Sequence, residues 1–218
     1  MRIRTAACLL LLGLLIVLVG VARAADDDGF VSLFDGKTLD GWIQRGGKAK
    51  YEVEDGAILG TTVLKTPNSF LCTPRNYDNF IFEVEFKADE GVNSGIQIRS
   101  NSLPDYKKGQ VHGYQVEIDT SDRAWTGGIY DEGRRGWLND LKNNEAAQKA
   151  FKHNEWNSFR IVADGESIKT WLNGVPAADL KDSMTKTGFI ALQVHGTKSE
   201  TPLHIRWRNI RIKELPAK

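Results

Sequence analysis

The sequence predicts an all-β protein: an antiparallel β-sandwich or jelly roll with one short helix in a loop. Segments in which apolar and polar residues alternate recur along the chain, and Gly, Asn, Asp and Pro separate them. Two pairs, Asp164-Gly165 and Asn173-Gly174, are typical of tight hairpin turns. Helix-favouring sequence is confined to one stretch, so the pattern indicates packed sheets rather than alternating strands and helices.

The first 24 residues have the pattern of a secretory signal peptide. Residues 1–4 form a short basic start, residues 6–21 are apolar, and residues 22–24 read Ala-Arg-Ala, a small-residue cleavage pattern. The apolar run is short for a membrane span, and no second run follows it. We therefore expect residues 25–218 to form a single domain that is secreted to the periplasm or exterior of a bacterium.

Charge and cysteine content limit the classes of partner and the cellular compartment that we expect for the protein. Loss of Arg2, Arg4 and Arg23 with the signal peptide leaves 26 Lys and Arg against 28 Asp and Glu, a net charge of −2. That balance argues against nucleic acid and against an anionic membrane surface as partners. Cys8 lies in the signal peptide, so Cys72 remains alone and no intramolecular disulfide can form, which fits a bacterial secreted protein. The apolar neighbours of Cys72 predict a packed residue at a strand end rather than a nucleophile.

Seven segments are predicted to be strands, and one is predicted to be a helix. Residues 80–87 place three Phe and one Val on one side, and residues 95–99 and 114–119 alternate in the same way. Residues 159–163 and 167–172 flank the Asp164-Gly165 turn, and residues 189–195 and 204–215 supply the last two strands. The helix is expected over residues 143–151, where Asn143 or Asn144 caps a run of good helix formers.

Four of these strands carry long polar or aromatic side chains opposite their apolar face. By the two-residue period of a strand they are Gln97 and Arg99; Gln115, Glu117 and Asp119; Lys169 and Trp171; and Gln193 and His195. An ordinary wetted sheet face is the alternative, and we accept it for Lys169. For the others, amides, carboxylates and indole rings favour a carbohydrate groove, because sugar hydroxyls need donors and acceptors and sugar C–H faces stack on aromatic rings.

A glycine-rich connection between residues 122 and 137 is predicted to form a ligand rim above this face. Its aromatic and basic residues include Trp125, Tyr130, Arg134, Arg135 and Trp137, and we expect Tyr130 and Arg134 to contact the ligand. Trp137 is followed by Leu138 and is instead expected to anchor the loop to the core.

Eight motifs occur in a fixed order over residues 30–215. They are residues 33–42 (LFDGKTLDGW), 93–99 (NSGIQIR), 113–119 (GYQVEID), 127–130 (GGIY), 155–157 (EWN), 171–174 (WLNG), 192–196 (LQVHG) and 207–215 (WRNIRIKEL). Together they resemble the bacterial 3-keto-disaccharide hydrolase family. The resemblance implies a jelly-roll sandwich similar to concanavalin-like and laminin-G-like domains, and action on glycosides that are already oxidised at C3.

Such a substrate would be cleaved by elimination, because a ketone at C3 acidifies the proton on C2. Glu117 or His195 is the expected base, and Arg99 is expected to hold the developing enolate oxygen. The expected substrate-binding residues are Gln97, Gln115, Asp119, Tyr130, Arg134, Trp171 and Gln193. No cofactor is required by the sequence, although Glu117, Asp119 and His195 could together hold a divalent metal.

Three other functions are considered. A classical glycosidase could employ Glu117 and Asp119, whose Cα atoms are ~6.6–7 Å apart by strand geometry, although catalytic carboxylates usually face each other across the substrate. A non-catalytic carbohydrate-binding module would stack sugars on Trp171 and Tyr130 and would need no base. An adhesion or scaffolding domain is the third, and a polar groove argues against it. In the first two cases, as for the hydrolase, the expected partner is a small carbohydrate.

Overall fold

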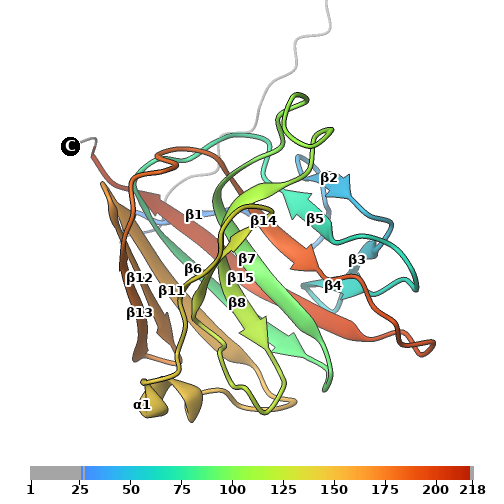
Figure 1. Cartoon of the computed structure of the whole chain (residues 1–218). Coiled ribbons are helices and arrows are strands. Elements are labelled where there is room, and N and C mark those ends of the chain that lie inside the picture. Colours follow the sequence, from blue (N-terminus) through green and yellow to red (C-terminus); the bar gives the residue numbers. More distant parts are fainter. Residues whose placement is uncertain (1–25, 27, 217–218) are drawn as a thin grey trace, which may run out of the picture.

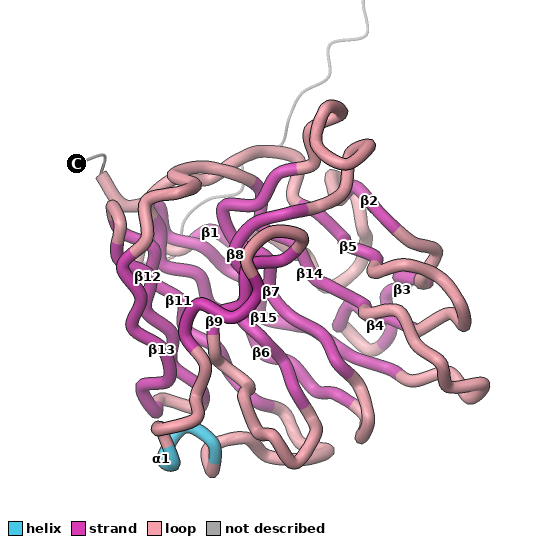
Figure 2. The backbone as a smooth tube through the Cα atoms, in the orientation of Figure 1, coloured by secondary structure: helices cyan, strands magenta, loops and turns pink. Residues whose placement is uncertain are grey.

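The structure is a computed structural model that describes residue 26 and residues 28–216 (Figure 1). The predicted signal peptide, residues 1–24, lies outside the described residues. The described chain forms two antiparallel sheets and one short helix, which confirms the predicted all-β sandwich. In Figure 2 the strands make up the body of the molecule, and the short helix α1 lies in a loop at its lower edge.

The first sheet, sheet A, is centred on two long strands of alternating sequence. Its order is β13 (Val175–Lys181), β12 (Ser167–Leu172), β11 (Asn157–Asp164), β6 (Phe80–Ala88), β15 (His204–Glu214), β4 (Ala57–Thr61) and β3 (Lys50–Glu54), with β1 (Val31–Ser32) paired to β15. In β6 every second residue is buried, as the alternation of Phe and Val with charged residues predicts. Sheet A therefore turns one face to the core and one charged face outward.

The second sheet, sheet B, carries most of the predicted site residues. Its order is β10 (Gly136–Asn139), β9 (Ile129–Glu132), β8 (His112–Asp119), β7 (Asn93–Asn101), β14 (Phe189–Val194), β5 (Ser69–Cys72) and β2 (Ile43–Gly46). Neighbours such as β7 and β14 are far apart in the chain, so long connections cross between the two sheets. In β7, β8 and β14 nearly every residue is buried, on both faces of the sheet. The outer face of sheet B is therefore also shielded from solvent along these three strands.

The main hydrophobic core lies between the two sheets. Ile161 and Phe82 of sheet A and Ile96 and Val116 of sheet B are completely buried in it. A smaller cluster on the outer face of sheet B contains Phe70, Cys72, Val111, Phe189 and Ala191. Cys72 ends β5, and burial raises the pKa of its thiol to about 12, so the residue is a packed strand-end cysteine as predicted.

The helix α1 (Glu145–Gln148) lies inside the predicted segment and is shorter than expected. Asn144 is its N-cap, as the sequence predicts, and its Oδ1 accepts a hydrogen bond from the Ala147 amide (3.1 Å). Only Ala147 of this helix is buried, so there is no apolar face to stabilise further turns. Within the described part of the chain, no helix has the length and apolarity needed to cross a bilayer.

Candidate functional site

The outer face of sheet B curls into a hollow. Asn68, which precedes β5, donates a hydrogen bond from Nδ2 to Glu132 Oε1 of β9 (3.2 Å). Three strands lie between β5 and β9, so a flat sheet would separate them by roughly 19 Å at the usual strand spacing. The contact therefore requires strong curvature. The hollow that results has a volume of about 450 Å³ and is lined by Asn68, Asn93, Gln115, Glu117, Arg123, Tyr130, Glu132, Trp137 and His195.

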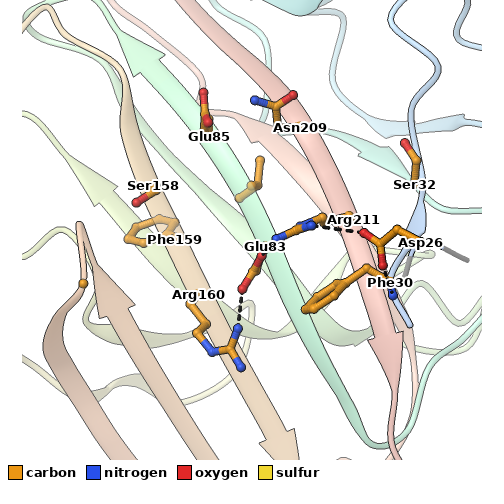
Figure 3. Close-up of a pocket in the computed structure, with 12 residues that line it drawn as sticks. Asp26, Phe30, Ser32, Glu83, Glu85, Ser158, Phe159, Arg160, Asn209 and Arg211 are labelled. Atoms are coloured by element: carbon orange, nitrogen blue, oxygen red, sulfur yellow. Dashed lines mark hydrogen bonds and ion pairs between the residues drawn. The ribbon is translucent and has the colours of Figure 1, made fainter. Parts of the chain in front are cut away.

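A larger hollow, of about 690 Å³, lies on the outer face of sheet A (Figure 3). Its charged groups neutralise one another: Glu83 pairs with Arg160 and with Arg211 (2.6 Å), and Arg211 also pairs with Asp26 (3.1 Å). Half-exposed ion pairs of this kind are common on wetted sheet faces and leave no carboxyl group free for proton transfer. The hollow on sheet B is therefore the better candidate for a functional site.

Glu117 is the central group of that hollow. It lies on β8 and is only 4% exposed. Both carboxyl oxygens are held by amides: Asn93 Nδ2 donates to Oε1 (2.7 Å) and Gln115 Nε2 donates to Oε2 (2.7 Å). Burial raises the pKa of Glu117 to about 7, although the two amides and Arg123 act to lower it. Near neutral pH this carboxyl group can therefore both take and give a proton.

A relay of side-chain hydrogen bonds fixes the orientation of Glu117. Ser100 Oγ donates to Gln97 Oε1 (2.7 Å), and Gln97 Nε2 donates to Gln115 Oε1 (2.6 Å). Gln97 is completely buried, and Gln115 has a relative exposure of 2%. Two of the three glutamines expected to bind substrate, Gln97 and Gln115, thus position the carboxyl group. Only Gln115 of the two lines the hollow.

Gly95 makes this relay sterically feasible. It is paired with Glu117 in the sheet, and a Cβ atom at this position would lie 2.5 Å from Gln115 Cγ. The Gln115 side chain therefore occupies the space that any other residue at position 95 would fill.

We expect Gly95→Ala to displace Gln115 and to disturb Glu117. Overpacking of this kind costs about 1–3 kcal/mol of stability, and misplacement of a reacting group by an ångström can cost on the order of 10²-fold in turnover. Urea unfolding and turnover assays check both effects. In a Gln115→Ala background the clash is absent, so the added cost of Gly95→Ala in both assays should be small. The same added cost in both backgrounds would contradict this account.

Arg123 and an aromatic group form the rim beside Glu117. The guanidinium lies over Trp125 (4.8 Å) and Trp137 (5.0 Å), and Trp137 packs edge-on against Tyr130 at 5.3 Å between ring centroids. Arg123 Nη2 is 3.5 Å from Glu117 Oε1, and its side chain is 39% exposed. Trp137 lines the hollow, so the expectation that it anchors its loop to the core is wrong.

Asp119 is occupied by this arginine. Arg123 Nε donates to Asp119 Oδ2 (2.8 Å), and Ser121 Oγ donates to Oδ1 (2.6 Å). Burial would raise the pKa of Asp119, but the hydrogen bonds from Ser121 and Arg123 outweigh it and hold that pKa below its usual value. Asp119 therefore stays ionised and serves to hold Arg123, and it does not line the hollow.

His195 lies at the opposite rim, directly after β14. Its Nδ1 is 2.7 Å from the Gly196 carbonyl oxygen. Because a carbonyl oxygen only accepts, Nδ1 carries the proton and the neutral ring has its lone pair on Nε2. Asn68 Oδ1 accepts from the Gly196 amide (3.0 Å), so the same asparagine connects this turn to Glu132.

Three residues expected at the site are elsewhere. Arg99 has φ of 45° at an irregularity of β7, and its guanidinium donates to Asp78 O, Gly165 O and Asn79 Oδ1. It is 1% exposed and bonded to loops that flank strands of sheet A, so the expected position beside Glu117 is wrong.

Arg134 and Trp171 also lie outside the hollow, so their expected positions at the site are wrong as well. Arg134 is held by the buried Asp131 (2.6 Å) and by Thr185 (2.6 Å), and it does not line the hollow. Trp171 belongs to β12, which is a strand of sheet A. Alternation placed Trp171 on the outward side of its strand, but it could not show that the strand belongs to the other sheet.

Gln193 was expected to bind substrate, but it does not line the hollow. It is completely buried on β14 opposite Gly95, and neither its Oε1 nor its Nε2 has a hydrogen-bond partner in the structure. The three expected metal ligands, Glu117, Asp119 and His195, are not gathered as a set. Among residues 26 and 28–216 no group of three or more His, Cys, Asp or Glu side chains is arranged to hold a metal ion.

The sequence analysis missed five residues that line the hollow: Asn68, Asn93, Arg123, Glu132 and Trp137. Asn93 and Glu132 had a usable signal, because they continue the alternation of Gly95 and Tyr130 by one step. Asn68 and Arg123 lie in connections, where the two-residue period gives no information.

Solved structures share the fold. A candidate glycosyl hydrolase from Parabacteroides distasonis superposes with a TM-score of 0.62 at 21% identity, covering 87% of this chain and 95% of that one. The carbohydrate-binding module CBM66 from Bacillus subtilis gives a TM-score of 0.60 at 17% identity, covering 80% and 96%. A Bacillus subtilis protein with a galectin-like fold gives 0.59 at 12% identity, covering 81% and 90%. At these identities the likeness concerns the fold, and it agrees with the predicted jelly roll.

A similarity in sequence is more specific. A 3-keto-disaccharide hydrolase from Bacteroides thetaiotaomicron is 35% identical over 79 residues, which are 33% of this chain and 27% of that protein. The match therefore spans about a quarter of that relative's length. The family model described as the 3-keto-alpha-glucoside-1,2-lyase-like domain matches residues 29–213. The resemblance found in the sequence motifs is thereby confirmed, and the chain belongs to the 3-keto-alpha-glucoside-1,2-lyase-like domain family.

Proposed function

We propose that this protein cleaves the glycosidic bond of 3-keto-glycosides and that Glu117 is the base that removes the C2 proton. The observation that carries the proposal is the state of Glu117: it is buried in a polar hollow, both oxygens are oriented by amides, and its pKa is raised to about 7. A base works best when its pKa lies near the working pH. The family match supports the choice of substrate.

The ketone makes this chemistry feasible. Removal of the C2 proton forms an enolate that is delocalised onto the C3 oxygen. Its electron pair then forms the C1–C2 double bond as the C1–oxygen bond breaks, and water adds to C1 afterwards. The proposal requires a cation near the enolate oxygen. Since Arg99 is buried elsewhere, Arg123 takes that role, because it lines the hollow within 3.5 Å of the Glu117 carboxyl.

The rim would hold the sugar ring. Trp137 and Tyr130 both line the hollow and offer ring faces and edges for the C–H surface of a pyranose. Such a substrate is a small carbohydrate, and it would be met in the periplasm or outside the cell if residues 1–24 direct secretion.

A classical glycosidase is the second candidate, and one observation favours it. Glu117 and Glu132 both line the hollow, and burial raises the pKa of each. Paired carboxyl groups of this kind serve glycosidases that act on unoxidised sugars. A binding module, the third candidate, would gain nothing from a buried carboxylate that destabilises the fold.

The deciding experiment uses the purified protein with a 3-keto-glucoside and, separately, with its unoxidised parent, both followed by NMR. Cleavage of the ketone alone is the expected result. Cleavage of the parent would favour the classical glycosidase, and binding without cleavage of either would favour the binding module. A parallel incubation with a chelator tests the expectation that the reaction needs no metal.

A further inference from the structure

We propose that Glu132 is the acid that protonates the departing glycosidic oxygen, so the leaving group lies against the side of the hollow formed by Glu132 and Asn68. This inference rests on the proposed function and adds a residue that neither the sequence motifs nor the family match assigns. It follows from the position of Glu132, from its hydrogen bonds and from its independence of Glu117.

One carboxyl oxygen of Glu132 accepts a hydrogen bond from a described residue, and the other accepts none. Asn68 Nδ2 donates to Oε1 (3.2 Å), and no described residue donates to Oε2. Glu132 lines the hollow, so Oε2 is available to a ligand there. The hydrogen bond from Asn68 to Oε1 favours protonation at Oε2. If Oε1 carried the proton, its O–H group and the Asn68 N–H group, which are both donors, would crowd the same oxygen. The O–H group of the acid is therefore on the oxygen that a substrate can reach.

The carboxyl is also held firmly enough to act on a defined atom. Asn68 uses its Nδ2 for Glu132 and its Oδ1 for the Gly196 amide (3.0 Å), so it braces β9 against the turn after β14. A side chain at position 196 would lie 2.4 Å from Thr66 O, so this turn also packs closely on the segment before Asn68. Burial raises the pKa of Glu132, against the opposing influence of Asn68 and His195, and this shift is in the direction that favours the acid form.

Glu132 and Glu117 have separate supports. Glu117 is oriented by Asn93 and Gln115 of β7 and β8, whereas Glu132 is oriented by Asn68 beside β5. Since they share no hydrogen-bond partner, one group can change its protonation state without displacing the other. Two such groups allow the proton to leave C2 at one site and another proton to reach the glycosidic oxygen at a second site.

The step balances with these two carboxyl groups and water. Glu117 takes the C2 proton, the C1–oxygen bond breaks with its electron pair on oxygen, and that oxygen takes the proton from Glu132. In the second half, water adds its hydroxide to C1 and its proton to the Glu132 carboxylate, and Glu117 returns a proton to C2. Both carboxyl groups end as they began, and the net reaction is hydrolysis.

The test compares Glu132→Gln with the wild-type protein on two 3-keto-glucosides that differ in leaving group. A methyl glucoside releases a basic alkoxide that needs protonation, whereas a 4-nitrophenyl glucoside releases a weakly basic phenolate that does not. We expect kcat/KM of the variant to fall by about 10²-fold or more on the methyl substrate and by less than about tenfold on the nitrophenyl substrate. Exchange of the C2 hydrogen with deuterated water should persist in the variant, since the base is intact.

Two further variants keep the outcome interpretable. Asn68→Ala leaves the carboxyl in place but unbraced, so it should show a smaller loss that is again confined to the methyl substrate. Glu155→Gln alters an exposed glutamate outside the hollow and should behave as wild type. Equal losses on both substrates, or loss of C2 exchange, in Glu132→Gln would overturn the assignment to Glu132. A wild-type protein that cleaves neither ketone would instead overturn the proposed function.

Discussion

Replacing Glu117 with glutamine is expected to lower turnover of a 3-keto-glucoside by about 10²–10⁴-fold. Glutamine has the shape of the carboxyl group, and its oxygen can still accept one of the two amide hydrogen bonds, from Asn93 or Gln115, but it cannot accept the C2 proton. Exchange of the C2 hydrogen with deuterated water should disappear in the same variant. Both quantities can be followed by NMR with wild-type protein as reference.

The pH dependence identifies the base. Glu117 acts as the carboxylate, so kcat/KM of the wild-type protein on the 4-nitrophenyl 3-keto-glucoside, whose leaving group needs no acid, should rise with pH and level off above about 7, the pKa to which burial raises Glu117. His195→Gln serves as the matched control and should keep that rise. If His195→Gln removed the rise and Glu117→Gln kept it, His195 would be the base.

Glu117→Gln should also show by how much the buried carboxylate of Glu117 lowers the free energy of unfolding. Burial raises the pKa of Glu117 from 4.5 to about 7, so the folded state holds a proton that the unfolded state has lost between these values. The wild-type protein is therefore penalised as the pH rises through this window, by about 3 kcal/mol once it is complete. Glu117→Gln should stabilise the protein by up to this amount at pH 8 and hardly at all below pH 4.5. Equal shifts in urea unfolding at pH 5 and pH 8 would show that the cost is not electrostatic.

Local sequence patterns predicted the strands and their faces well. The period of two correctly placed Gln115 and Glu117 on one face of β8, and it grouped them with His195, which lines the same hollow. It worked because each of these side chains stands directly on, or next to, a strand whose opposite face is fully apolar.

Two features of the site have no signature in that period. The curvature that brings Asn68 to Glu132 arises from the whole sheet and is not encoded in any one strand. The second is the left-handed backbone at Arg99, where φ of 45° ends the regular alternation of β7. Gln97 precedes this irregularity and was placed on the correct face. Arg99 lies within it and was not, because an irregular backbone conformation turns the side chain at that residue away from its expected direction.

Replacing Arg99 tests whether this residue has a structural role, as its position in the structure indicates, or a catalytic one. Its guanidinium is buried and donates to Asp78 O (2.7 Å), Gly165 O (2.7 Å) and Asn79 Oδ1 (3.0 Å), so it joins β7 to two loops of the other sheet. Arg99→Met would leave these acceptors unpaired in the interior, at a cost of about 3–5 kcal/mol in the free energy of unfolding.

Turnover separates this structural role from a catalytic one. The molecules of Arg99→Met that remain folded should cleave the 3-keto-glucoside at close to the wild-type rate. Arg123→Met should instead lose turnover. It should keep most of its stability, because the ion pairs of Arg123 are partly exposed. Urea unfolding and kcat normalised to the folded fraction measure both. The opposite result, a stable and inactive Arg99→Met, would mean that its guanidinium reaches the enolate oxygen after all. The sheet would then have to open at β7 when substrate binds, because in the present geometry every nitrogen of Arg99 is already bonded to the far layer of the sandwich.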